Sequence, residues 1–141
     1  MTVFGGEFGS DGVYRFPVRV YFEDTDFSTN VYHAAYLKFF ERARTEFLRA
    51  LGIHHFELIA GGQAFAIREM TISYDSPAHI DDLLEIATEM TEVGRARMVL
   101  RQTLVRDGEI ICRAGVVAVL LNEKGRPVRL PARLRGLLDR D

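Results

Sequence analysis

Cysteine is nearly absent from this sequence: Cys112 is the only one among 141 residues. A single cysteine cannot form an intrachain disulfide, so nothing indicates an oxidising compartment. Residues 1–12 contain neither the basic start nor the apolar run of a signal peptide. No stretch approaches the roughly 18 consecutive apolar residues of a membrane-spanning helix. These absences predict a cytoplasmic protein without stable membrane insertion.

A large excess of charge is also absent. The formal net charge of −2 at pH 7 does not favour nucleic acid or an anionic membrane as the main partner. Lysine is scarce, because among the 18 basic residues only Lys38 and Lys124 are lysines. The excess of arginine has two interpretations. It reflects genomic base composition, or some guanidinium groups bind a phosphate-bearing ligand, whose geometry they match.

Segments of alternating hydrophobicity predict β-strands. The first covers residues 14–21 and contains Pro17, which cannot donate a backbone hydrogen bond, so this strand should lie at a sheet edge or carry a bulge. Four longer strands are predicted over residues 64–74, 83–93, 95–105 and 110–121. Tight turns such as Asp107-Gly108 join most of them, which favours antiparallel pairing.

One long helix is predicted over residues 32–51, ending before Gly52. Its apolar residues recur at helical spacing and form one stripe: Tyr36, Phe39, Phe40, Ala43, Phe47, Ala50 and Leu51. An apolar sheet face and a single amphipathic helix bury these sides against each other. The predicted fold class is therefore α+β, with an antiparallel sheet of about five strands wrapped around one central helix.

The domain organisation is simple. Residues 1–12 contain four of the 12 glycines and are predicted to be a flexible lead-in. Residues 13–141 are predicted to form a single domain, with a short helix over residues 132–138 near its end.

Candidate catalytic residues gather in the polar segment 21–33, directly before the long helix. Helix capping is one interpretation, with Thr29 or Asn30 as the cap and the acidic residues facing the positive end of the helix dipole. A calcium loop is not favoured, because Thr29 and Ala35 stand where glycine and glutamate are required. His33 has no companion histidine or cysteine for a transition metal. No metal or organic cofactor is therefore expected.

Catalysis is the other interpretation of this segment. The first four N–H groups of a helix have no partner within it, so they can bind a developing oxyanion. Asp26 lies seven residues before His33, which is enough chain for the loop to fold back over the helix start. Such a site can polarise a carbonyl group and supply a base or nucleophile to attack it.

The run EDTDFSTNVYHAAYLKFFERARTEFLRALG, residues 23–52, resembles the 4-hydroxybenzoyl-CoA thioesterase family, most closely its Tol–Pal-associated (YbgC-type) branch. The branch shows D-T-D, V-Y-H-A-x-Y and E-R-A-R-T-E, and Asp26 and His33 match at the same separation. The resemblance covers about residues 14–135. One departure is Ser28-Thr29-Asn30, where the branch often has glycine. We interpret it as an adjustment of the loop shape or of the acyl pocket.

The resemblance implies a hotdog fold and hydrolysis of a short-chain or aromatic acyl-CoA thioester. It implies that Asp26 is the catalytic carboxylate, acting as nucleophile or as general base on water. It also implies that the backbone N–H of His33 contacts the thioester carbonyl, with the His33 side chain near the acyl or thiolate end. Family members form homodimers that join their sheets, with the active site at the subunit seam, and many form homotetramers.

Candidate substrate-binding residues are Tyr32 and Tyr36 in the motif and Arg126 and Arg129 near the C-terminus. Core packing is the alternative role for Tyr36. The two arginines either contact CoA phosphates or belong to a solvated surface.

Two other functions stay open. One is a non-enzymatic acyl-CoA-binding or envelope-complex partner module, for which an acyl-carrier partner is also a candidate. The other is a hydratase or dehydratase of hotdog fold.

Overall fold

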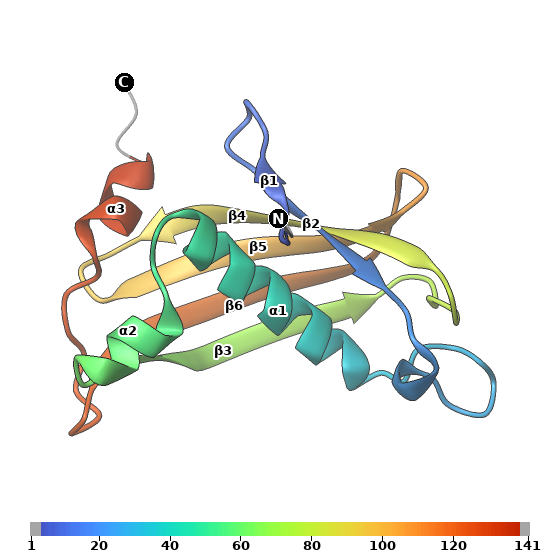
Figure 1. The fold of residues 1–141 in the computed structure, drawn as a ribbon, viewed down its shortest axis with the longest axis horizontal. Coiled ribbons are helices and arrows are strands. Elements are labelled where there is room, and N and C mark those ends of the chain that lie inside the picture. The colour runs from blue at the N-terminus through green and yellow to red at the C-terminus, as the bar shows by residue number, and fades with distance from the viewer. Residues whose placement is uncertain (1–3, 139–141) are drawn as a thin grey trace.

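The computed structural model describes residues 4–138 (Figure 1). One antiparallel sheet contains six strands in the order β1-β2-β4-β5-β6-β3. The strands are β1 Glu7–Phe8, β2 Tyr14–Arg19, β3 Gln63–Tyr74, β4 Leu83–Val93, β5 Arg97–Arg106 and β6 Glu109–Asn122. The helical elements are η1 Phe22–Asp24, α1 Ala35–Ala50, α2 His55–Ala60, α3 Ala132–Arg135 and η2 Gly136–Leu138.

The apolar stripe of α1 forms the centre of the core, as its spacing predicts. Tyr36, Phe39, Phe40, Ala43 and Phe47 are all buried against the sheet. The last two members of the predicted stripe are less buried: Ala50 is exposed, and Leu51 is half-buried and packs against the core.

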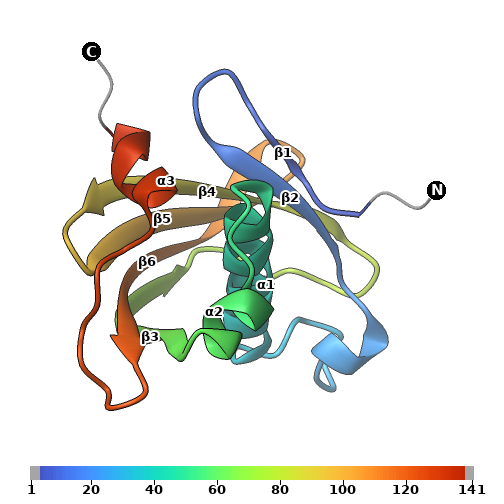
Figure 2. The same cartoon turned by 60° about the vertical axis from the view of Figure 1, so that its left-hand side comes forward.

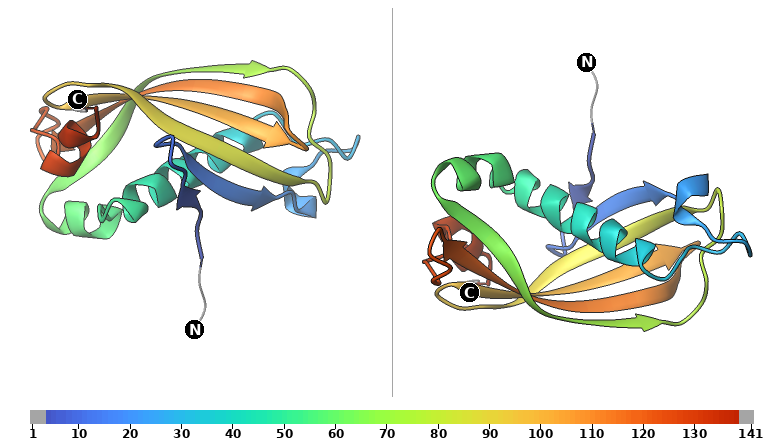
Figure 3. Two further views of the ribbon diagram at one scale, coloured as in Figure 1. Left: turned by 90° about the horizontal axis from the view of Figure 1, so that it is seen from above. Right: turned by 90° about the horizontal axis from the view of Figure 1, so that it is seen from below.

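The sheet curves around α1, which lies along its concave side (Figures 2 and 3). This is the hotdog arrangement that the sequence resemblance implies, so the predicted fold class is confirmed. Gly52 follows the helix with φ of +79°, a left-handed conformation that glycine adopts without a steric penalty.

The five predicted strands are present, and β1 is an additional strand that the sequence did not predict. β1 lies within the lead-in predicted to be flexible, and its two residues pair with Tyr14 and Arg15 of β2. Two residues are too few for a hydrophobic period to appear. The strand with Pro17 was predicted at a sheet edge, but β2 is second in the order, outside which lies the short β1. Pro17 pairs with Glu85 of β4 and has no partner in β1, so the sheet is open beside the proline itself. Residues 1–3 of the predicted lead-in and residues 139–141 of the predicted domain lie outside the described residues.

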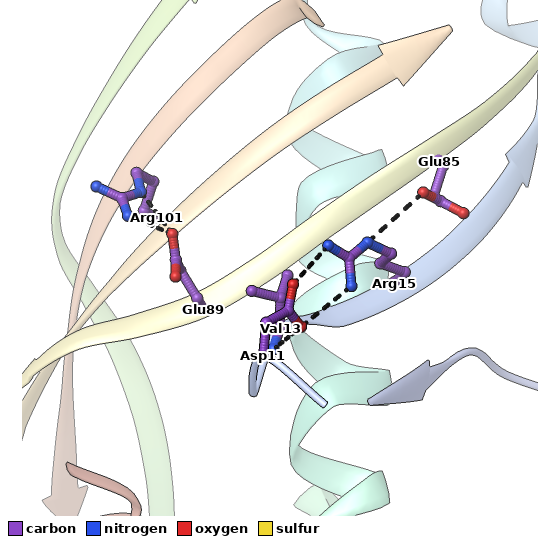
Figure 4. A network of polar contacts seen from close by, with 6 residues as sticks. All are labelled: Asp11, Val13, Arg15, Glu85, Glu89 and Arg101. Carbon is purple, nitrogen blue, oxygen red and sulfur yellow. Dashed lines mark hydrogen bonds and ion pairs between the residues drawn. The ribbon is translucent and has the colours of Figure 1, made fainter. Parts of the chain in front are cut away.

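Several charged side chains lie on the face of the sheet that is turned away from α1 (Figure 4). Arg15 forms ion pairs with Asp11 at 2.9 Å and with Glu85 at 4.0 Å, and Arg101 pairs with Glu89 on the adjacent strand. Exposed pairs of this kind contribute about 0–1 kcal/mol each. They keep this face solvated, while the stability of the fold comes from the apolar face.

β3 forms one end of the sheet, and within residues 4–138 β6 is its only strand neighbour (Figure 1). It is 12 residues long, so it presents a long row of unpaired backbone groups. Two large side chains with apolar surface are exposed on this strand: Ile67 is 45% exposed and Tyr74 is 46% exposed. A long edge with exposed apolar side chains is suited to pairing with another strand.

A buried polar network joins α1 to the middle of the sheet. The Gln102 amide nitrogen donates to the Phe40 carbonyl and to the Thr88 hydroxyl, both at 3.0 Å. The Gln102 amide oxygen accepts from Arg44 Nη1 at 3.1 Å. Burial lowers the pKa of the Arg44 guanidinium. Gln102 therefore links two groups of α1 to the Thr88 hydroxyl of β4 inside the core.

We expect Gln102→Leu to lower the free energy of unfolding by about 2 kcal/mol or more, because Arg44 and Thr88 would lose a buried partner. Urea denaturation followed by circular dichroism measures this change. Gln63→Leu is the matched control, since the half-buried Gln63 side chain forms no hydrogen bond with residues 4–138. Equal losses in the two variants would contradict the assigned role of Gln102.

Candidate active site

The loop between β2 and α1 folds into a tight turn around Asp26. The Asp26 N–H donates to the Asn30 carbonyl at 3.0 Å, and the Thr29 N–H donates to the Asp26 carbonyl at 3.1 Å. Asp26 Oδ1 accepts the Ser28 hydroxyl at 2.5 Å and the Ser28 N–H at 2.9 Å. The hydroxyl and then the backbone hydrogen bond of Ser28 lower the pKa of Asp26. The exposed Asp26 side chain is therefore an ionised carboxylate at neutral pH.

Thr29 adopts a left-handed backbone conformation with φ of +66°. This conformation costs a β-branched residue about 1–2 kcal/mol, because its Cβ approaches the backbone too closely. Contacts with the loop before β4 hold it there: the Ile80 N–H donates to the Thr29 carbonyl at 3.0 Å, and Asn30 forms a β-bridge with His79. In the segment Ser28-Thr29-Asn30, which replaces the glycines of the family branch, the left-handed conformation is therefore adopted by threonine and not by the better suited asparagine.

The start of α1 lacks a side-chain cap, so the capping interpretation of Thr29 and Asn30 is wrong. The helix begins at Ala35, three residues later than predicted, and its N-cap residue Ala34 forms no capping hydrogen bond. Thr29 and Asn30 are instead engaged with the loop before β4. Within residues 4–138, the N–H groups of His33 and Ala34 donate to no other group. Two backbone donors are therefore available at the positive end of the helix.

The carboxylate and the helix start face the same open hollow of about 360 Å³. Its lining residues are Asp26, Asn30, Val31, His33, Tyr36, Tyr74, Asp75, Ser76 and Pro77. The sequence-predicted residues Asp26, His33 and Tyr36 therefore come together. Tyr32 does not line the hollow; it is 49% exposed, and its ring lies 4.5 Å from the His33 ring, centroid to centroid.

The other side of the hollow comes from the end of β3, which the sequence analysis missed. The Tyr74 hydroxyl donates to the His33 carbonyl at 2.8 Å, and the Tyr74 ring lies 5.2 Å from the Tyr36 ring in an edge-to-face arrangement. The Tyr36 hydroxyl accepts the Ala78 N–H at 3.0 Å. No local signal marks Tyr74, because its contact with His33 spans 41 residues of sequence.

Arg126 and Arg129 lie at the opposite end of the sheet. They follow Asn122, which pairs with Gln63 at the start of β3, whereas Tyr74 stands at the end of that strand. A 12-residue strand places these ends roughly 35 Å apart. Within one chain, the two arginines therefore do not join Asp26.

A second hollow, of about 620 Å³, lies at this far end. It is lined by Val93, Gly94, Arg95, Arg129 and Arg135. Apart from the Arg135 contact with a backbone carbonyl, these arginine side chains form no hydrogen bond or ion pair within residues 4–138. Three guanidinium groups without a carboxylate make this hollow suited to an anion.

Neither a metal cluster nor a membrane-spanning helix occurs in the part of the chain that the structure describes. No group of three or more histidine, cysteine, aspartate or glutamate side chains there could hold a metal ion. Nor is any helix there both long enough and apolar enough to cross a bilayer.

Comparison with known proteins gives consistent matches. Residues 29–113 match the Thioesterase superfamily. The acyl-CoA thioester hydrolase YbgC of Escherichia coli is 44% identical over 124 residues, which cover 84% of this chain and 90% of the relative. The acyl-CoA thioesterase YbgC of Haemophilus influenzae is 43% identical over 127 residues, covering 89% and 93%.

Solved structures agree with the sequence matches. A probable thioesterase from Bartonella henselae superposes with a TM-score of 0.81 at 43% identity, covering 84% of this chain and 99% of that one. The family match begins at residue 29, three residues after Asp26, and includes the start of α1. The chain therefore belongs to the thioesterase superfamily, and it is a hydrolase.

Proposed function

We propose that this protein hydrolyses acyl-CoA thioesters, with Asp26 as the catalytic carboxylate. The observation that carries the proposal is the arrangement of the hollow, which an ionised Asp26 lines together with His33. The N–H groups of His33 and of the next residue, Ala34, are both unpaired within residues 4–138. A thioester needs both parts, since a nucleophile must reach its carbonyl carbon while its carbonyl oxygen gains negative charge. The YbgC relatives, whose names describe acyl-CoA thioester hydrolysis, support the substrate class.

The reaction follows from these groups. The thioester oxygen accepts hydrogen bonds from the N–H groups of His33 and Ala34, which stabilise the developing oxyanion. Asp26 then either attacks the carbonyl carbon or removes a proton from an attacking water. In the first route the C–S bond breaks to release CoA thiolate, and water hydrolyses the resulting mixed anhydride. Both routes yield the free acid and CoA, and the exposed His33 side chain is placed to assist the leaving thiolate.

The lining of the hollow fits a short-chain or aromatic acyl group. Val31, Tyr36 and Tyr74 provide apolar surface beside the reacting carbonyl. Two of these are aromatic rings that already contact each other edge to face. An aromatic acyl group can extend this packing without a further change in the fold.

A homodimer explains how the distant arginines reach the substrate. If two β3 edges pair antiparallel about a two-fold axis, the start of one strand lies against the end of the other. Arg126 and Arg129 of one subunit then lie at the same end of the joined sheet as Asp26 of the other subunit. CoA is long and carries several phosphates, so it can extend from the thioester toward these guanidinium groups. We therefore propose that each active site lies at the subunit seam and takes residues from both chains.

We expect Asp26→Asn to lower kcat by about 10²- to 10⁴-fold, the usual range for a positioned acid–base group, with little change in KM. Thiol release from butyryl-CoA and benzoyl-CoA measures both constants. Asp24→Asn is the matched control, because Asp24 lies two residues away, outside the hollow, and accepts the Tyr21 N–H. An Asp26→Asn variant that keeps more than half of the wild-type kcat would refute the assignment. Binding of acyl-CoA without thiol release by the wild-type protein would instead support a binding module.

We expect His33→Ala to lower kcat/KM by about 10- to 100-fold, or about 1.4 to 2.8 kcal/mol, because the backbone N–H remains when the side chain is removed. The same thiol-release assay applies, after circular dichroism has shown that the variant is folded. A folded His33→Ala variant that is less active than Asp26→Asn would reverse the roles, with His33 as the base and Asp26 as its orienting partner.

We expect a dimer or tetramer at micromolar concentration, measured by light scattering, because the free β3 edge pairs with its copy. Ile67→Lys places a charge on this edge and should weaken both assembly and activity. Ile110→Lys is the control, since Ile110 is similarly exposed, at 40%, but lies on β6. A fully active monomeric wild-type protein would contradict both the assembly and the location of the site at the seam.

A further inference from the structure

Tyr74, the last residue of β3, contacts the segment directly before α1. Its hydroxyl donates to the His33 carbonyl at 2.8 Å, and no other donor within residues 4–138 bonds to that oxygen. The His33 carbonyl and the Ala34 N–H belong to the same peptide group. A hydrogen bond to the carbonyl therefore fixes the plane of this peptide and polarises its N–H.

The Tyr74 ring also connects the two halves of the hollow. It packs edge to face on Tyr36 at 5.2 Å, and the Tyr36 hydroxyl accepts the Ala78 N–H at 3.0 Å. The Ala78 carbonyl in turn accepts the Val31 N–H at 2.8 Å, next to the turn that holds the carboxylate. Through these contacts the helix start, the end of β3 and the end of the Asp26 turn are held in one arrangement.

The helix start has little other support on this side. Its N-cap residue Ala34 supplies no side-chain hydrogen bond, and Tyr32 and His33 directly before it are exposed. Without a cap, the first turn of a helix is free to change its backbone angles. Tyr74 supplies from the sheet the constraint that a capping side chain usually supplies from within the helix.

We propose that Tyr74 is a positioning residue, whose hydroxyl orients the His33–Ala34 peptide so that the N–H groups at the start of α1 face the thioester oxygen. This role rests on the function proposed above. Burial raises the pKa of Tyr74, so its hydroxyl stays protonated and keeps donating throughout the neutral and mildly basic range. β3 is also the free edge of the sheet, at which the proposed subunit contact forms. Tyr74 is the last residue of this strand, so the end of the proposed contact lies next to the N–H groups that bind the oxyanion.

Tyr74→Phe tests this role, because it removes only the hydroxyl. We expect kcat for butyryl-CoA and benzoyl-CoA to fall about 3- to 10-fold, the effect of one hydrogen bond, with KM changed less than about twofold. Tyr14→Phe is the matched control. The Tyr14 hydroxyl also bonds to the backbone, accepting the Gly6 N–H at 2.7 Å, but its ring packs on Phe47 at the other end of α1. We expect its kcat to equal that of the wild type.

A second measurement follows the peptide itself and requires no activity. We expect the ¹⁵N amide resonance of Ala34 to move in the ligand-free Tyr74→Phe protein and to stay in place in Tyr14→Phe. An unmoved Ala34 resonance, an unchanged kcat in Tyr74→Phe, or an equal fall in both variants would each overturn the proposal. If the Ala34 resonance moves but the wild-type protein releases no thiol, the proposed function fails, and the role of Tyr74 in that reaction fails with it.

Discussion

The burial of one face of α1 against the concave side of the sheet is the constraint on which the rest of the structure depends. Five aromatic or small residues on this face have almost no exposed surface, and they fix both the rotation and the position of the helix. The start of α1 is consequently held beside the end of β3 and the loop before β4. The burial of α1 thus brings its start to the hollow, where the Tyr74 hydroxyl donates to the His33 carbonyl.

The hollow is built from two segments that are far apart in sequence, residues 26–36 and 74–77, and the first of them carries three local costs. Thr29 holds a left-handed angle, the helix start has no cap, and Asp26 is a charged group whose hydrogen bonds come from Ser28 alone. Conformations of this kind persist only where the surrounding structure determines them. Here the loop before β4 bonds to the turn and the Tyr74 hydroxyl bonds to the His33 carbonyl, so the groups proposed to react are held in place beside the hollow.

Periodic features could be predicted from the sequence, because alternation and helical spacing are properties of neighbouring residues. The five longer strands and the buried part of the α1 stripe are of this kind. The meeting of Asp26 with His33 was expected for another reason, because the seven-residue separation lets the loop fold back over the helix start. β1 was missed because two residues show no period. The cap was wrongly predicted because the loop before β4, 50 residues later, binds Thr29 and Asn30 instead. Tyr74 was missed, and the remote position of Arg126 and Arg129 was not foreseen, because both depend on which strand ends meet.

The chain is a hydrolase of the thioesterase superfamily, and the central claim is that its hollow cleaves the thioester bond of acyl-CoA at Asp26. Thiol release by the purified wild-type protein across a panel of saturated, aromatic and α,β-unsaturated acyl-CoAs tests this claim most directly. The account predicts one free thiol and one free acid for each acyl-CoA consumed. Binding of the panel without thiol release, or addition of water to the unsaturated members with the thioester intact, would contradict it.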